Sequence, residues 1–185
     1  GASPHKGVDP ILVGSQIVVA LQSIVSRNIA PLEPGVITVG AFHSGIKHNI
    51  ISDRAELQLT VRSDNAAIRE QLLDSIDRVA KGVAIAMGVP DDKMPEVIRS
   101  TQSTPPTIND PETAQKIRDA LTATMGEKAL IDVPREGMGA EDFAYFVDPK
   151  HGVKGVYFSV GGTPLDQIKP AASHHSPLFW VEPEP

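Results

Sequence analysis

The sequence predicts an α+β protein made of two parts, which divide between residues 105 and 106. In residues 1–105 the hydrophobic pattern follows the order helix, strand, strand, helix, strand. One further strand before residue 1 would complete a split βαβ unit. In residues 106–185 short apolar runs alternate with helical patterns, which is typical of an α/β layer. Between the two parts, the proline-rich run 104–111 interrupts both patterns and predicts a linker.

Residues 8–28 are predicted to form the first helix. Asp9 followed by Pro10 is a helix start signal, because proline is tolerated in a first helical turn. Apolar residues then recur at helical spacing and predict a face that packs on a core, namely Ile11, Ile17, Val18, Leu21, Ile24 and Val25. Pro31 and Pro34 end the pattern.

Two strands are predicted next, over residues 36–42 and 55–62. The first is rich in β-branched residues. In the second, apolar and polar residues alternate, so one face packs on a core and the other meets solvent or a partner. The apolar row is Ala55, Leu57, Leu59 and Val61, and the polar row is Glu56, Gln58, Thr60 and Arg62. The intervening loop is expected to carry His43, His48 and Asn49.

The second helix is predicted to start at a cap formed by Asp64 or Asn65 and to end near Met87. Its apolar residues keep helical spacing from Ile68 onward, and Gly88-Val89-Pro90 ends it. Residues 96–102 are predicted to form a third strand.

The second part is predicted to begin with a capped helix at Pro111 that ends at Gly126. Its apolar stripe is expected to be buried and consists of Ala114, Ile117, Leu121 and Met125. A short strand over residues 129–133, a helix over residues 143–146 and a buried strand over residues 153–160 are expected to follow.

Composition limits the classes of function. A hydrophobic fraction of 41% and a charged fraction of 22% are typical of a globular protein. The net charge of −6, without a cluster of lysine or arginine, indicates that the protein does not bind nucleic acid. The chain has no cysteine, so a metal would need His, Asp or Glu ligands. No apolar run reaches the length of a membrane span and no signal peptide is visible, which predicts a cytoplasmic protein without a membrane partner.

One stretch carries the strongest chemical signal, Arg135-Glu136-Gly137-Met138-Gly139-Ala140-Glu141-Asp142-Phe143-Ala144-Tyr145-Phe146. Gly137 and Gly139 are expected to permit a sharp turn before a helix. Glu141 and Asp142 would lie in its first turn, where the helix dipole favours negative charge. They are candidates for a catalytic role, and helix capping is the alternative. His174-His175-Ser176-Pro177 forms a second candidate motif.

Four motifs occur in a fixed order, namely Gly1-Ala2-Ser3-Pro4-His5-Lys6-Gly7-Val8-Asp9-Pro10, His43-Ser44-Gly45-Ile46-Lys47-His48-Asn49-Ile50-Ile51-Ser52-Asp53, Met138-Gly139-Ala140-Glu141-Asp142-Phe143 and His175-Ser176-Pro177. Together they resemble the two-metal amidohydrolases of the aminoacylase and carboxypeptidase family, in the branch of hippurate hydrolase, auxin-conjugate hydrolase and N-acyl-amino-acid amidohydrolase. The resemblance covers nearly the whole chain. Ala140 stands where the family pattern has a second glycine.

The resemblance implies a catalytic α/β domain that is interrupted by a smaller lid or dimerisation domain. Residues 1–105 would be that lid, a split βαβ (ferredoxin-like) domain lacking its first strand. Residues 106–185 would be the C-terminal portion of an α/β metallo-exopeptidase catalytic domain. The chain starts without methionine and reads as a fragment of a longer protein.

The resemblance also implies two divalent metal ions, zinc or manganese. Most of their ligands would lie upstream of Gly1, and only the final ligand maps onto this chain, at His175. One histidine cannot hold a catalytic metal alone, so these residues by themselves are expected to be inactive and not to retain the metals. Glu141 and Asp142 match positions that support the site by orienting the metal shell or the substrate.

Asn49 and Arg62 match family positions that face the active site, in some members across the dimer. An arginine fork pairs well with a substrate carboxylate. The alternatives are a solvated strand end for Arg62 and turn formation for Asn49. His5 matches a histidine of the family and could assist substrate binding, or it could satisfy local hydrogen bonds. His174 could support His175 or be exposed, and no role is predicted for His43.

Three functions remain open from the sequence. The first is metal-dependent hydrolysis of the amide bond of N-acyl amino acids or similar conjugates by a homodimer that pairs through the lid. The second is a non-catalytic dimerisation or binding module. The third is metal-free hydrolysis by His175 with Glu141. The sequence has no Gly-x-Ser-x-Gly motif, so this alternative lacks a recognisable serine nucleophile.

Overall fold

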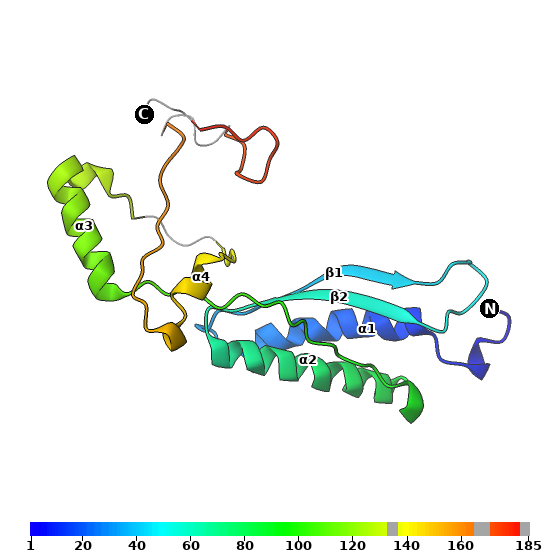
Figure 1. Cartoon of the computed structure of the whole chain (residues 1–185). Coiled ribbons are helices and arrows are strands. Elements are labelled where there is room, and N and C mark those ends of the chain that lie inside the picture. Colours follow the sequence, from blue (N-terminus) through cyan, green and yellow to red (C-terminus); the bar gives the residue numbers. More distant parts are fainter. Residues whose placement is uncertain (133–136, 165–170, 182–185) are drawn as a thin grey trace.

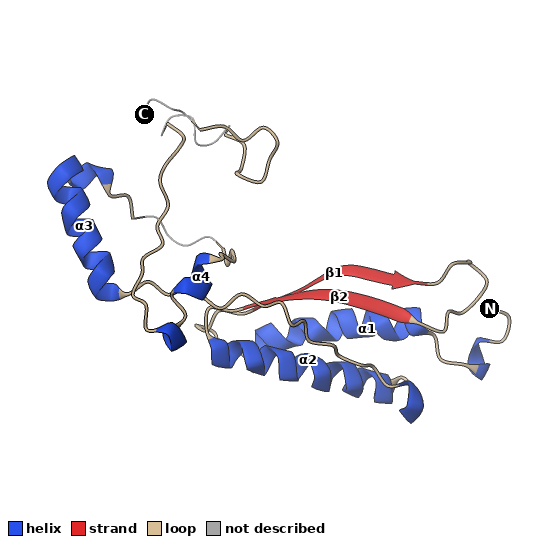
Figure 2. Ribbon diagram, viewed as in Figure 1, coloured by secondary structure: helices blue, strands red, loops and turns tan. Residues whose placement is uncertain are grey.

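The computed structural model describes residues 1–132, 137–164 and 171–181. Residues 1–87 form a unit of two layers, in which a two-stranded hairpin lies on a pair of helices (Figure 1). The chain then leaves this unit and carries two further helices and long irregular segments (Figure 2). The α+β class is therefore confirmed, with a small sheet.

The helix layer consists of α1 (Pro10–Ser23), continued by a wider turn over Ile24–Asn28, and α2 (Ala66–Ala86). Asp9 caps α1, because its carboxylate accepts from the Ile11 N–H at 2.9 Å, and Pro10 starts the helix as predicted. Of the two caps considered for α2, Asn65 is the one formed. Its side chain accepts from the N–H groups of Ala67 and Ile68 at 2.9 and 3.3 Å.

The sheet layer pairs β1 (Val36–Ser44) with β2 (Ala55–Arg62) in antiparallel register. Val36 lies opposite Arg62 and Ser44 opposite Ala55, with a register shift between Val39 and Ala41. β1 is longer than predicted and includes His43, which therefore lies on a strand and not in the loop. The alternation predicted for β2 is confirmed, because Leu57, Leu59 and Val61 pack against the core.

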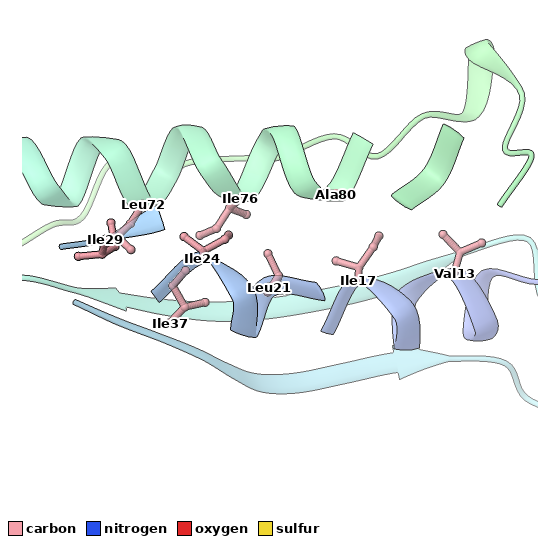
Figure 3. Packing of buried hydrophobic residues seen from close by; sticks show 9 residues of the cluster. All are labelled: Val13, Ile17, Leu21, Ile24, Ile29, Ile37, Leu72, Ile76 and Ala80. Atoms are coloured by element: carbon pink, nitrogen blue, oxygen red, sulfur yellow. The ribbon is translucent and has the colours of Figure 1, made fainter. Parts of the chain in front are cut away.

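The core lies between the two helices and the inner face of the hairpin, as Figure 3 shows. Leu21, Ile24 and Leu72 are its largest fully buried side chains. Burying a side chain of this size stabilises a fold by roughly 1.5–3 kcal/mol. The remaining members of the cluster are Val13, Ile17, Ile29, Ile37, Ile76 and Ala80. The predicted stripe of α2 packs on this core, whereas that of the first helix is confirmed only in part. Ile17, Leu21 and Ile24 are buried, but Ile11 and Val25 are exposed and the prediction that they face the core is wrong.

The helix over Pro10–Asn28 is long and apolar enough to span a membrane by length and composition, with a mean hydropathy of 1.3. The prediction that no segment reaches that length is therefore wrong. The physical role of the helix is nevertheless clear from its packing, since Val13, Ile17 and Leu21 are buried between α2 and the sheet. It is the core helix of the unit.

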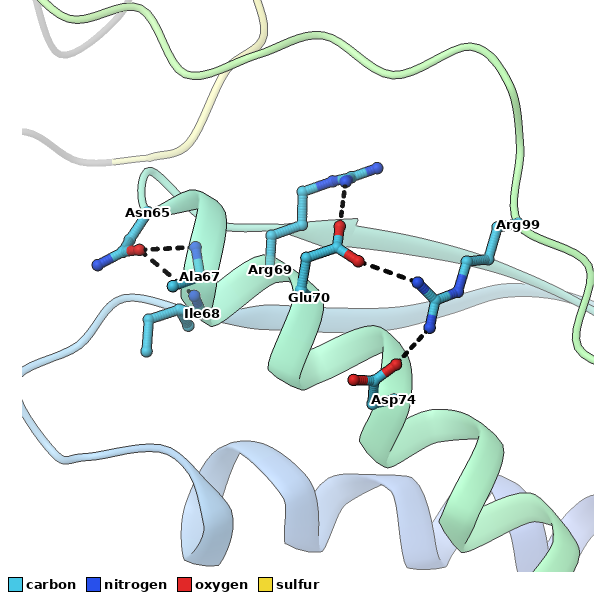
Figure 4. Close-up of polar contacts among 7 residues, drawn as sticks. All are labelled: Asn65, Ala67, Ile68, Arg69, Glu70, Asp74 and Arg99. Atoms are coloured by element: carbon cyan, nitrogen blue, oxygen red, sulfur yellow. Dashed lines mark hydrogen bonds and ion pairs between the residues drawn. The ribbon is translucent and has the colours of Figure 1, made fainter.

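The prediction of a third strand over residues 96–102 is wrong. After a short 3-10 turn at Asp91–Lys93, the chain returns alongside α2 and has no strand partner among the described residues. Arg99 holds this segment to the helix, with bonds of 2.9 Å to Glu70 and 2.5 Å to Asp74 (Figure 4). A β-strand requires a second strand about 4.8 Å away with which to pair. The element beside residues 96–102 is the helix α2.

The second part contains α3 (Pro111–Met125), α4 (Phe143–Phe146) and 3-10 turns at Glu127–Ala129 and Pro149–His151. Asp110 caps α3, and Gly126, with φ of 83°, ends it as predicted. The expected burial of the α3 stripe is wrong, because none of its residues is buried.

The two strands predicted for the second part are also wrong over the described residues. Residues 130–132 follow a 3-10 turn without pairing, and Val133 lies outside the described residues. Residues 153–160 are extended in Figure 1 but neither paired nor buried, and Val160 is 83% exposed. No neighbouring strand in the described part of the chain supplies the hydrogen bonds that a strand needs.

Candidate functional site

The candidate carboxylates lie on a loop that leads into α4. Arg135 and Glu136, which open the motif, lie outside the described residues. Gly139 does not adopt positive φ, so the predicted turn does not use the backbone freedom of this glycine. Ala140 also lacks positive φ. The alanine that replaces the family's glycine is therefore accommodated without backbone strain.

Glu141 and Asp142 immediately precede α4 and do not serve as caps. Their carbonyls accept from the N–H groups of Ala144 and Tyr145, at 3.1 and 3.0 Å. The Asp142 side chain makes no capping hydrogen bond. Both residues are exposed. The capping alternative thus accounts for neither carboxylate, and both stay available for a ligand.

Tyr157 lies near Glu141. Partial burial raises the pKa of the Tyr157 hydroxyl, and the neighbouring Glu141 carboxylate raises it further. Because the Glu141 side chain is exposed, its carboxylate can accept a hydrogen bond from a substrate.

A small apolar cluster supports this pair. Ala144 and Val147 are buried, and the rings of Phe143 and Tyr157 lie 5.9 Å apart. Gly155 packs directly on Val147, where any Cβ would collide with the valine methyl group. The cluster fixes α4 against residues 155–157 and thus fixes Tyr157 beside Glu141.

Asn109 holds the backbone of Tyr157 from the other side. Its amide nitrogen donates to the Tyr157 carbonyl and its amide oxygen accepts from the Tyr157 N–H, both at 2.8 Å. Asp110 adds a backbone bond of 3.0 Å to the Gly155 carbonyl. An asparagine side chain here substitutes for a neighbouring strand.

Asn109 and Tyr157 were not predicted as site residues. The signal for Tyr157 was weak, since an aromatic residue in an apolar run usually indicates a core strand. Asn109 stands in the predicted linker, where asparagine is typical of turns. Only the folded chain brings both to the motif.

Arg62 lies beside the candidate loop. It is the last residue of β2, and its Nη1 donates to the Met138 carbonyl at 2.7 Å. The structure thus brings together Arg62 and the segment that contains Glu141 and Asp142. The guanidinium is exposed, as the alternative of a solvated strand end requires, but it is also bound to the second part of the chain.

Asn49 and His5 lie at the opposite end of the unit. Asn49 is in the turn between β1 and β2, and its carbonyl touches Gly1. β2 separates this turn from Arg62 and is about 23 Å long at the usual rise per residue. Within one chain, Asn49 therefore cannot share a ligand with Arg62.

His5 is exposed in the 3-10 turn Pro4–Lys6. The turn is closed by backbone bonds of Lys6 and Gly7. Among the described residues the His5 imidazole forms no hydrogen bond, so the local hydrogen bonds considered as the alternative role are not present there. No contact in the described part of the chain joins His5 to Glu141, Asp142 or His175.

His175 lies in the turn 173–179, apart from α4 in Figure 1. The His174 ring lies 4.4 Å from the His175 ring and packs edge-on against Phe179 at 6.5 Å. Ser176 closes the turn with a backbone bond of 2.8 Å to Ser173. Both imidazoles are exposed, and no contact joins His175 to Glu141 in the described part of the chain.

The described residues do not form a metal centre. No three His, Asp or Glu side chains gather there closely enough to hold an ion. Two surface hollows of the described part are lined by other residues, Asp74, Asp77, Val97 and Arg99 in one and Gln115, Arg118, Asp119, Thr122, Glu127, Leu130 and Asp132 in the other. The candidate residues therefore form an incomplete site, with exposed carboxylates, a guanidinium nearby and a separate imidazole.

Comparison with known proteins gives these residues a context. The model of the peptidase dimerisation domain matches residues 1–87. The N-acetyl-L-cysteine deacetylase of Bacillus subtilis is 32% identical, over 98% of this chain and 39% of that protein. The hippurate hydrolase of Campylobacter jejuni is 34% identical, over 81% of this chain and 38% of that protein. The chain thus spans well under half the length of these relatives.

Solved structures support the same fold. A protein from methicillin-resistant Staphylococcus aureus superimposes with a TM-score of 0.74 and 27% identity, over 98% of this chain and 44% of that one. A Bacillus subtilis structure, described as a dinuclear metal binding peptidase from the M20 family, has a TM-score of 0.54 and 24% identity. That match covers 77% of this chain and 35% of the other, and it bears on the fold alone.

Proposed function

This chain belongs to the M20 peptidase family, with residues 1–87 as its dimerisation domain, and we propose that the whole protein hydrolyses the amide bond of N-acyl amino acids or similar conjugates. The names of two relatives support this substrate class, since N-acetyl-L-cysteine and hippurate are both N-acyl amino acids. Residues 106–185 would be the C-terminal portion of the catalytic domain, and the protein would act in the cytoplasm.

One observation carries the proposal. Arg62, at the end of the dimerisation unit, lies against the loop that holds Glu141 and Asp142. A guanidinium is suited to bind a substrate carboxylate in a bidentate manner. An acyl amino acid held by Arg62 through its carboxylate would extend its amide toward this segment, where the Glu141 carboxylate is exposed.

The metal requirement is met only in part by these residues. We propose that the whole enzyme uses two divalent ions, zinc or manganese, as the family resemblance implies, and that His175 supplies one ligand. An exposed imidazole on a tight turn is a suitable ligand. The described residues do not assemble the rest of a centre. The other ligands would come from the part of the longer protein that these 185 residues do not include.

The dimerisation unit supports a homodimer. Within the described ranges, the hairpin of β1 and β2 has an unpaired edge on each strand, and such an edge is a template for a second chain. A dimer would also give Asn49 a role in substrate binding. Within one chain Asn49 lies a strand length from Arg62, but the Asn49 of a second copy could reach a ligand that Arg62 binds. Sedimentation equilibrium over a range of concentrations tests this, and a monomer throughout would contradict it.

A non-catalytic binding module is the second candidate function. It is favoured by one feature, namely that residues 1–87 carry a complete hydrophobic core while the described residues hold no metal group. Metal analysis of the full-length protein separates the two candidates. About two metals per chain would support the hydrolase, and a metal-free full-length protein would favour the module.

The hydrolase is tested with the full-length protein and a panel of N-acetyl and N-benzoyl amino acids, by measuring the released amine. We expect hydrolysis that a chelator abolishes and that added zinc or manganese restores. Hydrolysis that survives complete removal of metal would favour the metal-free alternative. Absence of hydrolysis in metal-loaded protein would contradict the proposed substrate class.

A further inference from the structure

Two side chains join the candidate segment to the first part of the chain from different places. Arg62 donates from Nη1 to the Met138 carbonyl at 2.7 Å. Tyr145 donates from its hydroxyl to the Ser103 carbonyl at 2.8 Å. The first bond reaches the loop before Glu141 and the second reaches the helix after Asp142, so the two bonds bracket the carboxylates.

Arg62 is well placed for this contact. Its backbone is fixed by pairing with Val36 at the end of the hairpin. Its side chain belongs to the polar row, so it points away from the core that Val61 contacts. A hydrogen bond from a charged donor is stronger than a neutral one, and the acceptor residue Met138 is half-buried.

Tyr145 is fixed in a different way. Ala144 on α4 and Val147 just after it are both buried, so the short helix is anchored on one side. Tyr145 is 45% exposed, and its hydroxyl donates to the Ser103 carbonyl. The buried residues Ala144 and Val147 hold α4 in the cluster around Phe143, and the Tyr145 hydroxyl joins α4 to Ser103.

The segment between these two contacts is exposed. A Cβ at Gly139 would meet open space. Gly139, Ala140, Glu141 and Asp142 are all exposed. Their position therefore depends on what holds each end of the segment.

We propose that Arg62 and Tyr145 are positioning residues, which tie the segment 138–146 to β2 and to the Ser103 backbone and thereby set where the Glu141 and Asp142 carboxylates lie. This inference concerns the chain without ligand and does not depend on the proposed hydrolase activity. It gives Arg62 a second role beside carboxylate binding. The two roles separate experimentally, because the tie is measured without substrate.

Hydrogen–deuterium exchange tests the tie directly. The reporters are the amides of Ala144, Tyr145 and Val147, which bond to the carbonyls of Glu141, Asp142 and Phe143. Losing a charge-assisted hydrogen bond is expected to speed their exchange about fivefold or more. Peptides that cover residues 137–147 would be compared with peptides that cover α2.

Four variants isolate the effect. Arg62→Ala and Arg62→Gln remove the long cation, and Arg62→Lys keeps a cation that can still reach Met138. Tyr145→Phe removes only the hydroxyl. Arg54→Ala is the matched control, because Arg54 is an exposed arginine just before β2 that pairs with Glu56 and not with the second part.

Faster exchange confined to residues 137–147 in Arg62→Ala, Arg62→Gln and Tyr145→Phe, with Arg62→Lys close to the unmodified protein, would support the ties. Unchanged exchange in these variants would overturn the proposal. So would an equal increase across α2, or the same increase in Arg54→Ala, since either would indicate general destabilisation. Failure of the hydrolase assay alone would leave the proposal intact.

Discussion

Gly14 of α1 lies directly against the ring of Phe42 on β1. A Cβ at Gly14 would approach the tip of that ring to 2.7 Å, which is closer than real contacts allow. The absence of a side chain at this point of the helix lets α1 lie close to the sheet. Gly14 therefore leaves room for the Phe42 ring between α1 and β1.

This contact leads to a prediction about stability. Gly14→Ala should lower the free energy of unfolding by about 1 kcal/mol, because the overpacking cost exceeds the gain in helix propensity. Gly82→Ala is the control, since Gly82 lies in α2 with open space around it. That variant should raise the free energy of unfolding by about 0.5–1 kcal/mol.

Urea unfolding measures both values. The double variant Gly14→Ala with Phe42→Leu should recover part of the loss, because the smaller side chain makes room. If Gly14→Ala stabilised the protein as much as Gly82→Ala, the ring would be free to move aside.

Asp110 should make the start of α3 sensitive to acid. Its side-chain bond to the Thr113 hydroxyl lowers the pKa of the Asp110 carboxyl most, and its bond to the Thr113 N–H lowers it further. Because the folded pKa is depressed, this stabilisation is present above the unfolded pKa of about 3.9. It is lost as the pH falls through the lower folded value.

An NMR titration of the carboxyl carbon should therefore show Asp110 titrating below the usual aspartate range. Asp110→Asn keeps a good cap without a titrating group. In this variant the stability of α3 should no longer fall as the pH drops from about 4 through the folded pKa of Asp110. An ordinary aspartate pKa for Asp110 would mean that the cap does not persist in solution.

His175→Ala should weaken one metal site of the full-length protein. Loss of a ligand or its support commonly costs roughly 10- to 100-fold in metal affinity or activity. His174→Ala is the matched variant, because the adjacent imidazole stacks on His175 and Phe179. Metal content by mass spectrometry and hydrolysis rate should fall together for the first variant and much less for the second. Equal losses would assign the ligand to the pair, and no loss in either would contradict the role of His175.

Arg62→Ala should raise KM in the full-length protein chiefly for substrates with a free carboxylate, since the planar fork binds that group. The same N-acyl amino acids as methyl esters provide the comparison. An equal effect on acids and esters would indicate that Arg62 acts only through the tie to Met138.

Tyr157→Phe tests whether the hydroxyl near Glu141 matters, while keeping the ring against Phe143. The variant should fold normally, with unchanged thermal unfolding. In the full-length enzyme it should lower kcat, because the Tyr157 hydroxyl lies near the Glu141 carboxylate. An unchanged kcat would exclude a role of this hydroxyl beside Glu141.

The local patterns of this chain determined its first unit. Apolar residues at helical spacing predicted α1 and α2, and the alternation of apolar and polar residues predicted β2. The apolar faces of these three elements pack against one another in one core. The caps at Asp9, Asn65 and Asp110 were also predictable. Each cap side chain accepts from a backbone N–H only two or three residues further along the chain, so the nearby sequence is enough to identify it.

Tertiary structure alone decided the remainder. Residues 96–102 and 153–160 have the composition of strands, yet a strand exists only where a second strand offers its hydrogen-bonding groups, and α2 and Asn109 occupy those places in the described chain. The contacts of Arg62 with Met138 and of Tyr157 with Glu141 join residues far apart in sequence. Periodicity reports which face of an element is apolar, but a contact between distant elements depends on how the whole chain packs. The sequence therefore determined the dimerisation unit, and the packing determined which polar groups meet beside it.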